Sequence, residues 1–199
     1  MAKTYSYQIE NNLYINLTNK CSNACTFCVR NGKDSYYGNS LWLDKEPTVQ
    51  EVIDSIDFTK SYNEIVFCGF GEPTYRINEL VELAKYFKSK GYKTRLNTNG
   101  QGNLINNKDI TVMLKGVIDL VNVSLNMPNK IEYQKICVSK FGEQAFDALI
   151  DFAVGCKNNN VNVCFSVVDC IGAEKVEMCK KLAEQVKIPL RVREFISDS

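Results

Sequence analysis

The chain contains no histidine among its 199 residues. Histidine is the side chain most often used as a general base and is a common zinc ligand, so its absence disfavours hydrolase mechanisms and leaves zinc with cysteine ligands. No apolar run approaches the about 18 residues that a membrane-spanning helix needs, and the N-terminus lacks the apolar stretch of a secretory signal. A net charge of +1 gives no overall field to attract nucleic acid. We therefore expect neither a membrane nor a nucleic-acid partner.

The composition is that of an ordinary globular protein, with 45% hydrophobic and 24% charged residues. The length fits one domain with a substantial core, and neither an internal repeat nor a low-complexity linker divides it. We expect a single domain over residues 1–199. The nine cysteines are an odd number and no export signal precedes them, which favours free or metal-bound thiols over disulfides. The expected location is the reducing cytoplasm.

Strand-like and helix-like segments alternate along the chain. Strands are predicted over residues 13–18, 64–68, 94–97, 120–125, 161–168 and 190–195. Helices are predicted over 48–58, 77–87, 108–114, 131–136, 146–153 and 173–186. Residues 29–47 are expected to be irregular. About six β/α units predict an α/β fold with a parallel sheet, and they are too few for a complete eight-stranded barrel, so a partial barrel or a doubly wound sheet remains.

Four of the predicted strands have one apolar and one polar face. In residues 121–126, for example, Val121 and Val123 alternate with Asn122 and Ser124. Buried parallel strands are usually apolar on both faces. A repeated polar face therefore favours a lumen that holds a polar ligand. The alternative is that these side chains satisfy one another or face solvent.

Three cysteines stand within eight residues, directly after the first predicted strand. Cys21, Cys25 and Cys28 have the spacing C-x3-C-x2-C. A [4Fe–4S] cluster normally has four cysteine ligands, so three would leave one iron with an open coordination site, where a cofactor or substrate can bind. A zinc site is the competing interpretation, and it would need a fourth cysteine from elsewhere in the chain.

Two glycine-containing turns follow the next two main predicted strands. Residues 68–74 read Cys-Gly-Phe-Gly-Glu-Pro-Thr, and residues 96–102 read Leu-Asn-Thr-Asn-Gly-Gln-Gly. The carboxyl ends of parallel strands are where α/β proteins bind ligands. Each turn taken alone is also compatible with a tight turn that binds nothing.

Taken together, these motifs resemble those of the radical S-adenosylmethionine (SAM) superfamily over essentially the whole chain. The cysteines match its C-x3-C-x-aromatic-C motif, with Phe27 as the aromatic residue. Residues 69–73 resemble its GGEP motif with Phe70 inserted, residues 96–100 its TNG turn, and residues 123–126 its ribose-contacting strand end. The resemblance implies a partial (β/α)6 barrel with parallel strands, whose open lumen holds a [4Fe–4S] cluster and SAM.

The same resemblance implies a role for each matching residue. The cluster ligands would be Cys21, Cys25 and Cys28. The methionine amino end would meet Gly71, Glu72 and Pro73. The ribose or carboxylate contacts would be Asn97, Asn99, Ser124 and Asn126, and the adenine surroundings Phe27 and Val168. One electron from an external flavodoxin-type or ferredoxin-type reductant would cleave SAM to methionine and a 5′-deoxyadenosyl radical, which abstracts hydrogen from an unidentified substrate.

Within the superfamily, residues 28–31 and 39–43 resemble the TatD-associated radical SAM proteins, which implies a functional link to a TatD-family hydrolase. The compact size also resembles the activases of glycyl-radical enzymes. The substrate is either a small molecule or a protein. Two other function classes stay open, a non-catalytic zinc-binding module and an iron–sulfur electron carrier.

Arg191 and Arg193 are the candidates for binding an anionic group of the substrate, with surface pairing to Glu194 or Asp198 as the alternative. The aromatic-rich residues 30–43 are a candidate cover for the site. Two cysteines are expected in the core, Cys156 and Cys179. Four others receive no firm role, namely Cys68, Cys137, Cys164 and Cys170.

Overall fold

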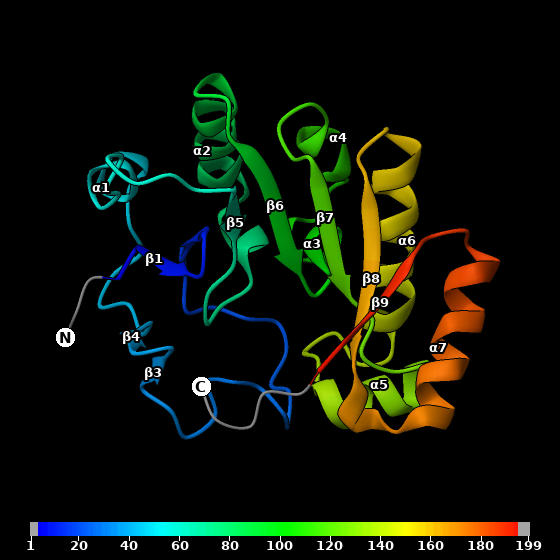
Figure 1. Cartoon of the computed structure of the whole chain (residues 1–199). Helices are drawn as coiled ribbons and strands as arrows, with labels where there is room; N and C mark the ends of the chain where they lie inside the picture. The colour runs from blue at the N-terminus through cyan, green and yellow to red at the C-terminus, as the bar shows by residue number, and fades with distance from the viewer. Residues whose placement is uncertain (1–3, 195–199) are drawn as a thin grey trace.

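The structure, a computed structural model, describes residues 4–194 and consists of one main sheet with helices packed on it. Six strands run parallel, β2 (Asn12–Ile15), β5 (Glu64–Phe67), β6 (Lys93–Thr98), β7 (Leu120–Ser124), β8 (Val163–Val168) and β9 (Leu190–Arg193). An antiparallel strand that we did not predict, β1 (Ser6–Ile9), borders β2. The order β1-β2-β5-β6-β7-β8-β9 has β1 and β9 at its edges (Figure 1). In the described part of the chain the sheet is thus open, as expected for a partial barrel.

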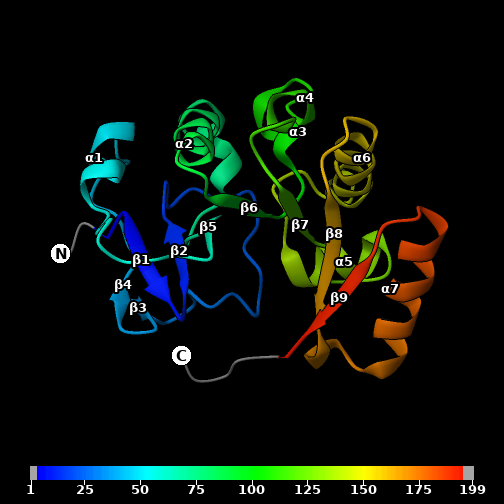
Figure 2. The same ribbon diagram turned by 45° about the horizontal axis from the view of Figure 1, so that its top comes forward.

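The crossovers between parallel strands carry the helices, most of which pack on the outer face of the sheet (Figure 2). They are α1 (Val49–Asp54), α2 (Ile77–Ser89), α3 (Gly102–Asn106), α4 (Thr111–Leu114), α5 (Lys130–Cys137), α6 (Gln144–Asn158) and α7 (Ala173–Gln185), with short 3₁₀ helices η1 (Pro73–Arg76) and η2 (Asp169–Ile171). Thr48 begins α1 with the predicted capping box. From residue 4 to residue 194, no helix is long and apolar enough to cross a membrane.

The two faces of the sheet differ, as the sequence predicts. Ile65, Leu96 and Val123 are fully buried in the apolar core between the strands and the outer helices. Asn122 is buried on the opposite, inner face. The prediction of a buried apolar face is less accurate at the edge strand β9. Val192 is 43% exposed there, because a strand at the edge has neighbours on one side only.

Local differences from the predictions occur in loops. The stretch expected to be irregular contains a short hairpin, β3 (Ser35–Tyr36) with β4 (Asn39–Ser40). Helix α3 was not predicted, because its Asn-Gly-Gln-Gly entry is typical of a turn. Helix α4 begins three residues later than predicted, since the carboxylate of Asp109 accepts a hydrogen bond from the Thr111 N–H. Phe195, the end of the last predicted strand, and Asp198 lie outside the described residues.

Candidate active site

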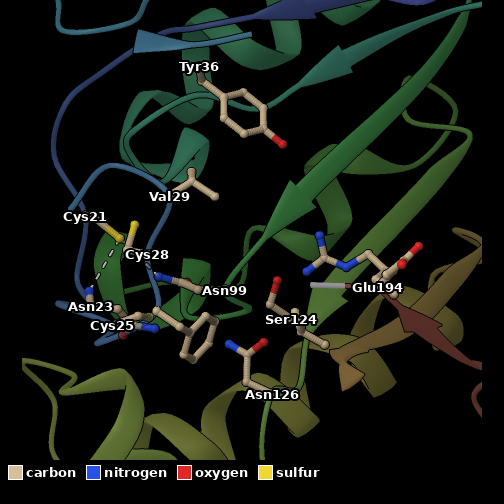
Figure 3. A pocket seen from close by; sticks show the side chains of 13 residues that line it. Cys21, Asn23, Cys25, Cys28, Val29, Tyr36, Asn99, Ser124, Asn126 and Glu194 are labelled. Atoms are coloured by element: carbon tan, nitrogen blue, oxygen red, sulfur yellow. Dashed lines mark hydrogen bonds between the residues drawn. The ribbon is translucent and has the colours of Figure 1, made fainter. Parts of the chain in front are cut away.

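The three motif cysteines line one cavity of about 260 Å³ at the carboxyl ends of the parallel strands. Figure 3 shows Cys21 and Cys28 on one side of it, opposite Ser124 and Asn126. The complete lining is Cys21, Asn23, Cys25, Phe27, Cys28, Val29, Tyr36, Asn99, Ser124, Asn126, Val168, Arg193 and Glu194. Segments far apart in the sequence therefore bring nine of the predicted site residues to a single cavity.

The remaining predicted site residues lie outside the lining: Gly71, Glu72, Pro73, Asn97 and Arg191. Arg191 is exposed on β9. Asn97 lies on the inner face of β6, and its buried Oδ1 has no hydrogen-bond partner among the described residues. The same is true of Oδ1 of Asn126, which does line the cavity. Buried polar atoms are normally paired, so these two are available to a bound molecule.

The cysteine loop is held in place through its backbone. The N–H of Ala24 donates to the carbonyl of Cys137 at 3.0 Å, and the N–H of Thr26 donates to the carbonyl of Ile136 at 2.9 Å. The loop thus pairs with the end of α5, which was not predictable from local sequence. Because these hydrogen bonds join backbone groups, they do not depend on the side chains of the paired residues.

A buried side-chain network supports the loop from below. Tyr133, 0% exposed, accepts hydrogen bonds at its hydroxyl from Asn23 Nδ2 and Gln101 Nε2, both at 3.0 Å. Gln101 Nε2 also donates to Asn23 Oδ1 at 2.8 Å, and Ser139 Oγ donates to Gln101 Oε1 at 2.9 Å. Sequence reasoning missed these four residues, although Asn23 and Gln101 stand inside motifs that it singled out.

The thiols of the motif are neutral at ordinary pH. Burial raises the pKa of Cys21 to about 12 and also raises the pKa of Cys28. For Cys25 the largest cause of a raised pKa is a hydrogen bond with the thiol of Cys137, and burial adds to it. Metal binding would therefore have to displace the protons.

The donor set fits an iron–sulfur cluster, and the same thiols are also suitable zinc ligands. Three soft thiol donors line one cavity, with no histidine available. Among residues 4–194, no three cysteine, aspartate or glutamate side chains are arranged so that they could already hold a metal ion. Cys137 is a candidate for a fourth thiol, and its thiol forms hydrogen bonds with Cys25, with Tyr133 and with Asn126 Nδ2, the last at 3.5 Å.

Glu72 is 3% exposed and is fully engaged by the protein. Its Oε1 accepts hydrogen bonds from the hydroxyls of Thr74 and Thr98, both at 2.7 Å. Its Oε2 accepts from the backbone N–H of Asn99 at 2.7 Å. Burial raises the pKa of this carboxyl, and the hydrogen bonds partly oppose that effect. Asn99 in turn donates from Nδ2 to Ser22 Oγ at 2.8 Å, so Glu72 orients a residue that faces the cysteine loop.

Gly69 and Gly71, in the turn that contains Glu72, let the backbone of this turn lie close to residues that follow β2. A Cβ on Gly71 would clash with the carbonyl oxygen of Thr18 and lie 2.7 Å from that of Lys20. A Cβ on Gly69 would clash with the side chain of Asn16. Glycine at both positions lets the turn after β5 pack against the end of β2.

The aromatic-rich loop over residues 30–43 contributes to the cavity and is also anchored to the turn after β5. Tyr36 is part of the lining. Trp42 packs edge-to-face on Phe70 with ring centroids 5.2 Å apart, and Arg30 donates to the carbonyl of Phe70. Trp42 therefore holds the loop to the turn after β5.

The other cysteines fall into distinct environments. Cys156 and Cys179 are buried in the core, as predicted. Cys170 is exposed, and Cys164 donates from Sγ to Asn122 Oδ1 at 3.3 Å on the inner face of the sheet.

Residues 15–186 match the family model described as the radical SAM superfamily. The chain belongs to the radical SAM superfamily. Members of this superfamily are enzymes that use SAM and an iron–sulfur cluster. A protein of Methanocaldococcus jannaschii named "putative glycyl-radical enzyme activating enzyme" is 31% identical over 121 residues, which cover 58% of this chain and 46% of that protein.

Solved structures show the same fold at low sequence identity. Streptococcus suis SuiB bound to its precursor peptide SuiA has a TM-score of 0.69 at 19% identity, covering 94% of this chain and 39% of that one. The structure of anSMEcpe with bound AdoMet has a TM-score of 0.63 at 19% identity, covering 92% of this chain and 50% of that one. This radical SAM chain thus spans half or less of each of these proteins.

Proposed function

We propose that the protein binds a [4Fe–4S] cluster through Cys21, Cys25 and Cys28 and binds SAM in the adjoining cavity. When bound, the cluster supplies the electron that cleaves SAM to methionine and a 5′-deoxyadenosyl radical, which takes hydrogen from a substrate. The observation that carries the proposal is the convergence of these three thiols with Asn99 and Asn126 on one cavity.

The lining offers different surroundings to different parts of SAM. Asn99, Ser124 and Asn126 provide amide and hydroxyl groups for the ribose or carboxylate, and Phe27 and Val168 provide apolar surroundings for adenine. Asn97 is a further polar candidate, reached from the inner face of β6.

For the turn over residues 71–73 we propose backbone contacts with the amino end of methionine, because the Glu72 carboxylate is occupied by Thr74, Thr98 and Asn99. Glu72 would then be a positioning residue. Gly71 and Pro73 shape the turn in which it stands.

The partners follow from the chemistry and the relatives. The electron requires an external reductant of the flavodoxin or ferredoxin type. The M. jannaschii relative is named as an activating enzyme, which supports a partner protein as substrate, with a small molecule as the alternative. The resemblance of residues 28–31 and 39–43 to TatD-associated proteins adds a proposed link to a TatD-family hydrolase. We place the protein in the reducing cytoplasm, consistent with nine free cysteines.

Anaerobic reconstitution tests this function. We expect about four irons and four sulfides per chain, with a spectral change when SAM is added and 5′-deoxyadenosine after reduction. Cys25→Ala should lose the cluster and SAM cleavage, whereas Cys170→Ala, at an exposed cysteine outside the cavity, should keep both. Stoichiometric zinc without sulfide would show a zinc module. A cluster that does not respond to SAM would show an electron carrier.

A further inference from the structure

The thiols of Cys25 and Cys137 meet beside the cavity. Cys25 is one of the three motif cysteines, and its thiol forms a hydrogen bond with that of Cys137, the last residue of α5. In Figure 3 Cys25 lies apart from Cys21 and Cys28. Two cysteine side chains in contact are the starting geometry for a disulfide bond.

Backbone pairing between the cysteine loop and the end of α5 accounts for this contact. Asn23 and Ser139 form an antiparallel β-bridge. Two residues forward on one segment correspond to two residues back on the other, so the register of the bridge places Cys25 opposite Cys137. The 2.9 Å hydrogen bond from the Thr26 N–H to α5 keeps the same register. Opposed residues of antiparallel pairs lie about 4.5–5.5 Å apart at Cα, within the about 4.4–6.8 Å that a disulfide spans.

The two thiols differ in access. Cys25 is partly exposed and lines the cavity, whereas Cys137 is 0% exposed. A small oxidant that enters the cavity therefore meets Cys25 first. Cys137 is held behind it by the 3.5 Å hydrogen bond from Asn126 Nδ2. An accessible thiol in contact with a second, resolving thiol is an arrangement found at redox-active cysteines.

We propose that Cys25 and Cys137 form a reversible disulfide when the protein meets peroxide without its cluster, and that this bond protects Cys25 from irreversible oxidation. The inference rests on the proposed function where it takes Cys25 to be a cluster ligand. The disulfide would withhold that ligand until a cellular dithiol reduces the bond, so cluster assembly would resume only under reducing conditions. In a reducing compartment such a bond is transient.

The oxidation balances with one molecule of hydrogen peroxide. The sulfur of Cys25 attacks one peroxide oxygen and the O–O bond breaks. Cys25 becomes a sulfenic acid, and the departing hydroxide takes the Cys25 thiol proton and leaves as water. The sulfur of Cys137 then attacks the sulfenic sulfur, the S–S bond forms and the S–O bond breaks. The second hydroxide takes the Cys137 thiol proton, so two thiols lose two electrons and the peroxide is reduced to two waters.

Peptide mapping of the full-length chain tests the bond. Iron-free, fully reduced protein is treated with hydrogen peroxide, and the remaining thiols are alkylated in denaturant. Trypsin places the two cysteines on separate peptides, residues 21–30 and 136–140. We expect these peptides to be joined by one disulfide, with alkyl groups on the other two cysteines of the first peptide, and to separate with dithiothreitol. Because the hydrogen bond with Cys137 and burial raise the pKa of Cys25, the reaction is slow and the exposure is prolonged.

Cys137→Ala removes the resolving thiol. After the same treatment we expect sulfinic acid at Cys25 to be roughly threefold more abundant than in the parent protein, because dithiothreitol does not reverse this oxidation state. After reduction and anaerobic reconstitution the variant should recover correspondingly less cluster. Cys137→Ser, whose hydroxyl keeps a partner for Asn126, should behave as Cys137→Ala. Cys170→Ala, at an exposed cysteine outside the cavity, should behave as the parent.

Absence of the linked peptides from the oxidised parent protein would overturn the pairing, and so would a bond between two motif cysteines in their place. Equal amounts of sulfinic acid at Cys25 in the parent and in both Cys137 variants would overturn the protective role. Failure of the proposed function has a different signature, because the parent would then take up no cluster whether or not the peptides are linked. Cluster assembly and SAM cleavage without linked peptides would reject only the disulfide.

Discussion

The carboxylate of Glu72 accepts a 2.7 Å hydrogen bond from the backbone N–H of Asn99. This bond joins the turn after β5 to the turn after β6, two motifs separated by helix α2 in the sequence. Asn99 then contacts Ser22 in the cysteine loop. A buried carboxylate therefore links the two strand-end turns to the residues that are proposed to hold the cluster.

Glu72→Gln should destabilise the fold by about 1–3 kcal/mol, because the amide donor cannot accept all the bonds that the two carboxylate oxygens now accept. Urea unfolding measures this change. We also expect weaker SAM binding as Asn99 loses its orientation. Glu82→Gln, on an exposed part of α2, is the control. Unchanged stability and SAM affinity in Glu72→Gln would contradict the linking role.

Cys137→Ala should retain the cluster. Cys137 contacts the cysteine loop through its backbone carbonyl, which the substitution preserves, and through the hydrogen bond of its thiol with Cys25, which cluster binding to Cys25 would replace. Iron and sulfide content after anaerobic reconstitution should match the parent protein, while Cys25→Ala should lose both. If Cys137→Ala lost its iron, a fourth thiol would be a ligand and the open iron site would be wrong.

Tyr133→Phe should cost about 1–3 kcal/mol in the free energy of unfolding, because Asn23 and Gln101 each lose a buried acceptor. Tyr62→Phe is the matched control, since its hydroxyl makes an exposed hydrogen bond to the Asp57 carbonyl. Denaturant titration compares the two variants. Similar stability of both would show that the network below the cysteine loop contributes little.

Gly71→Ala should destabilise more than Gly69→Ala. The Cβ at residue 71 would meet backbone carbonyl oxygens of Thr18 and Lys20. The Cβ at residue 69 would meet the side chain of Asn16, which can shift without moving the backbone, at the expense of its hydrogen bonds to the carbonyls of Thr4 and Leu41. Overpacking of this kind costs about 1–3 kcal/mol. Thermal unfolding of the two variants gives the order, and the reverse order would refute the packing explanation.

Alkylation should distinguish the cysteines outside the cavity by the reactivity of their thiols. Burial raises the pKa of Cys156 to about 12 and that of Cys179 to about 11, so both thiols stay protonated near pH 8. Because the pKa of each thiol is higher in the folded than in the unfolded protein, the two protonated thiols stabilise the fold. This contribution to the free energy of unfolding is complete below the unfolded pKa of about 8.5 and is lost as pH rises through 11 to 12. Mass spectrometry after iodoacetamide treatment at pH 8 should show Cys170 modified first. Early modification of Cys156 would contradict its burial.

Much of the fold was predictable because it depends on local patterns. Alternating residues such as Val121 and Asn122 identified strands with one polar face, and the capping box at Thr48 gave the start of α1. Strand β1 was missed although Tyr5, Tyr7 and Ile9 alternate, since so short a strand is stabilised only by pairing with β2.

The sequence by itself determined the spacing of the three thiols, the order of the strand-end motifs and the absence of histidine, because these are properties of the chain. Only the tertiary structure decided that Glu72 is engaged by Asn99 and that Cys137 lies beside Cys25. These pairs are separated by many residues. Their contacts depend on strand order, register and the closeness of backbone approach at Gly69 and Gly71, which no local pattern encodes.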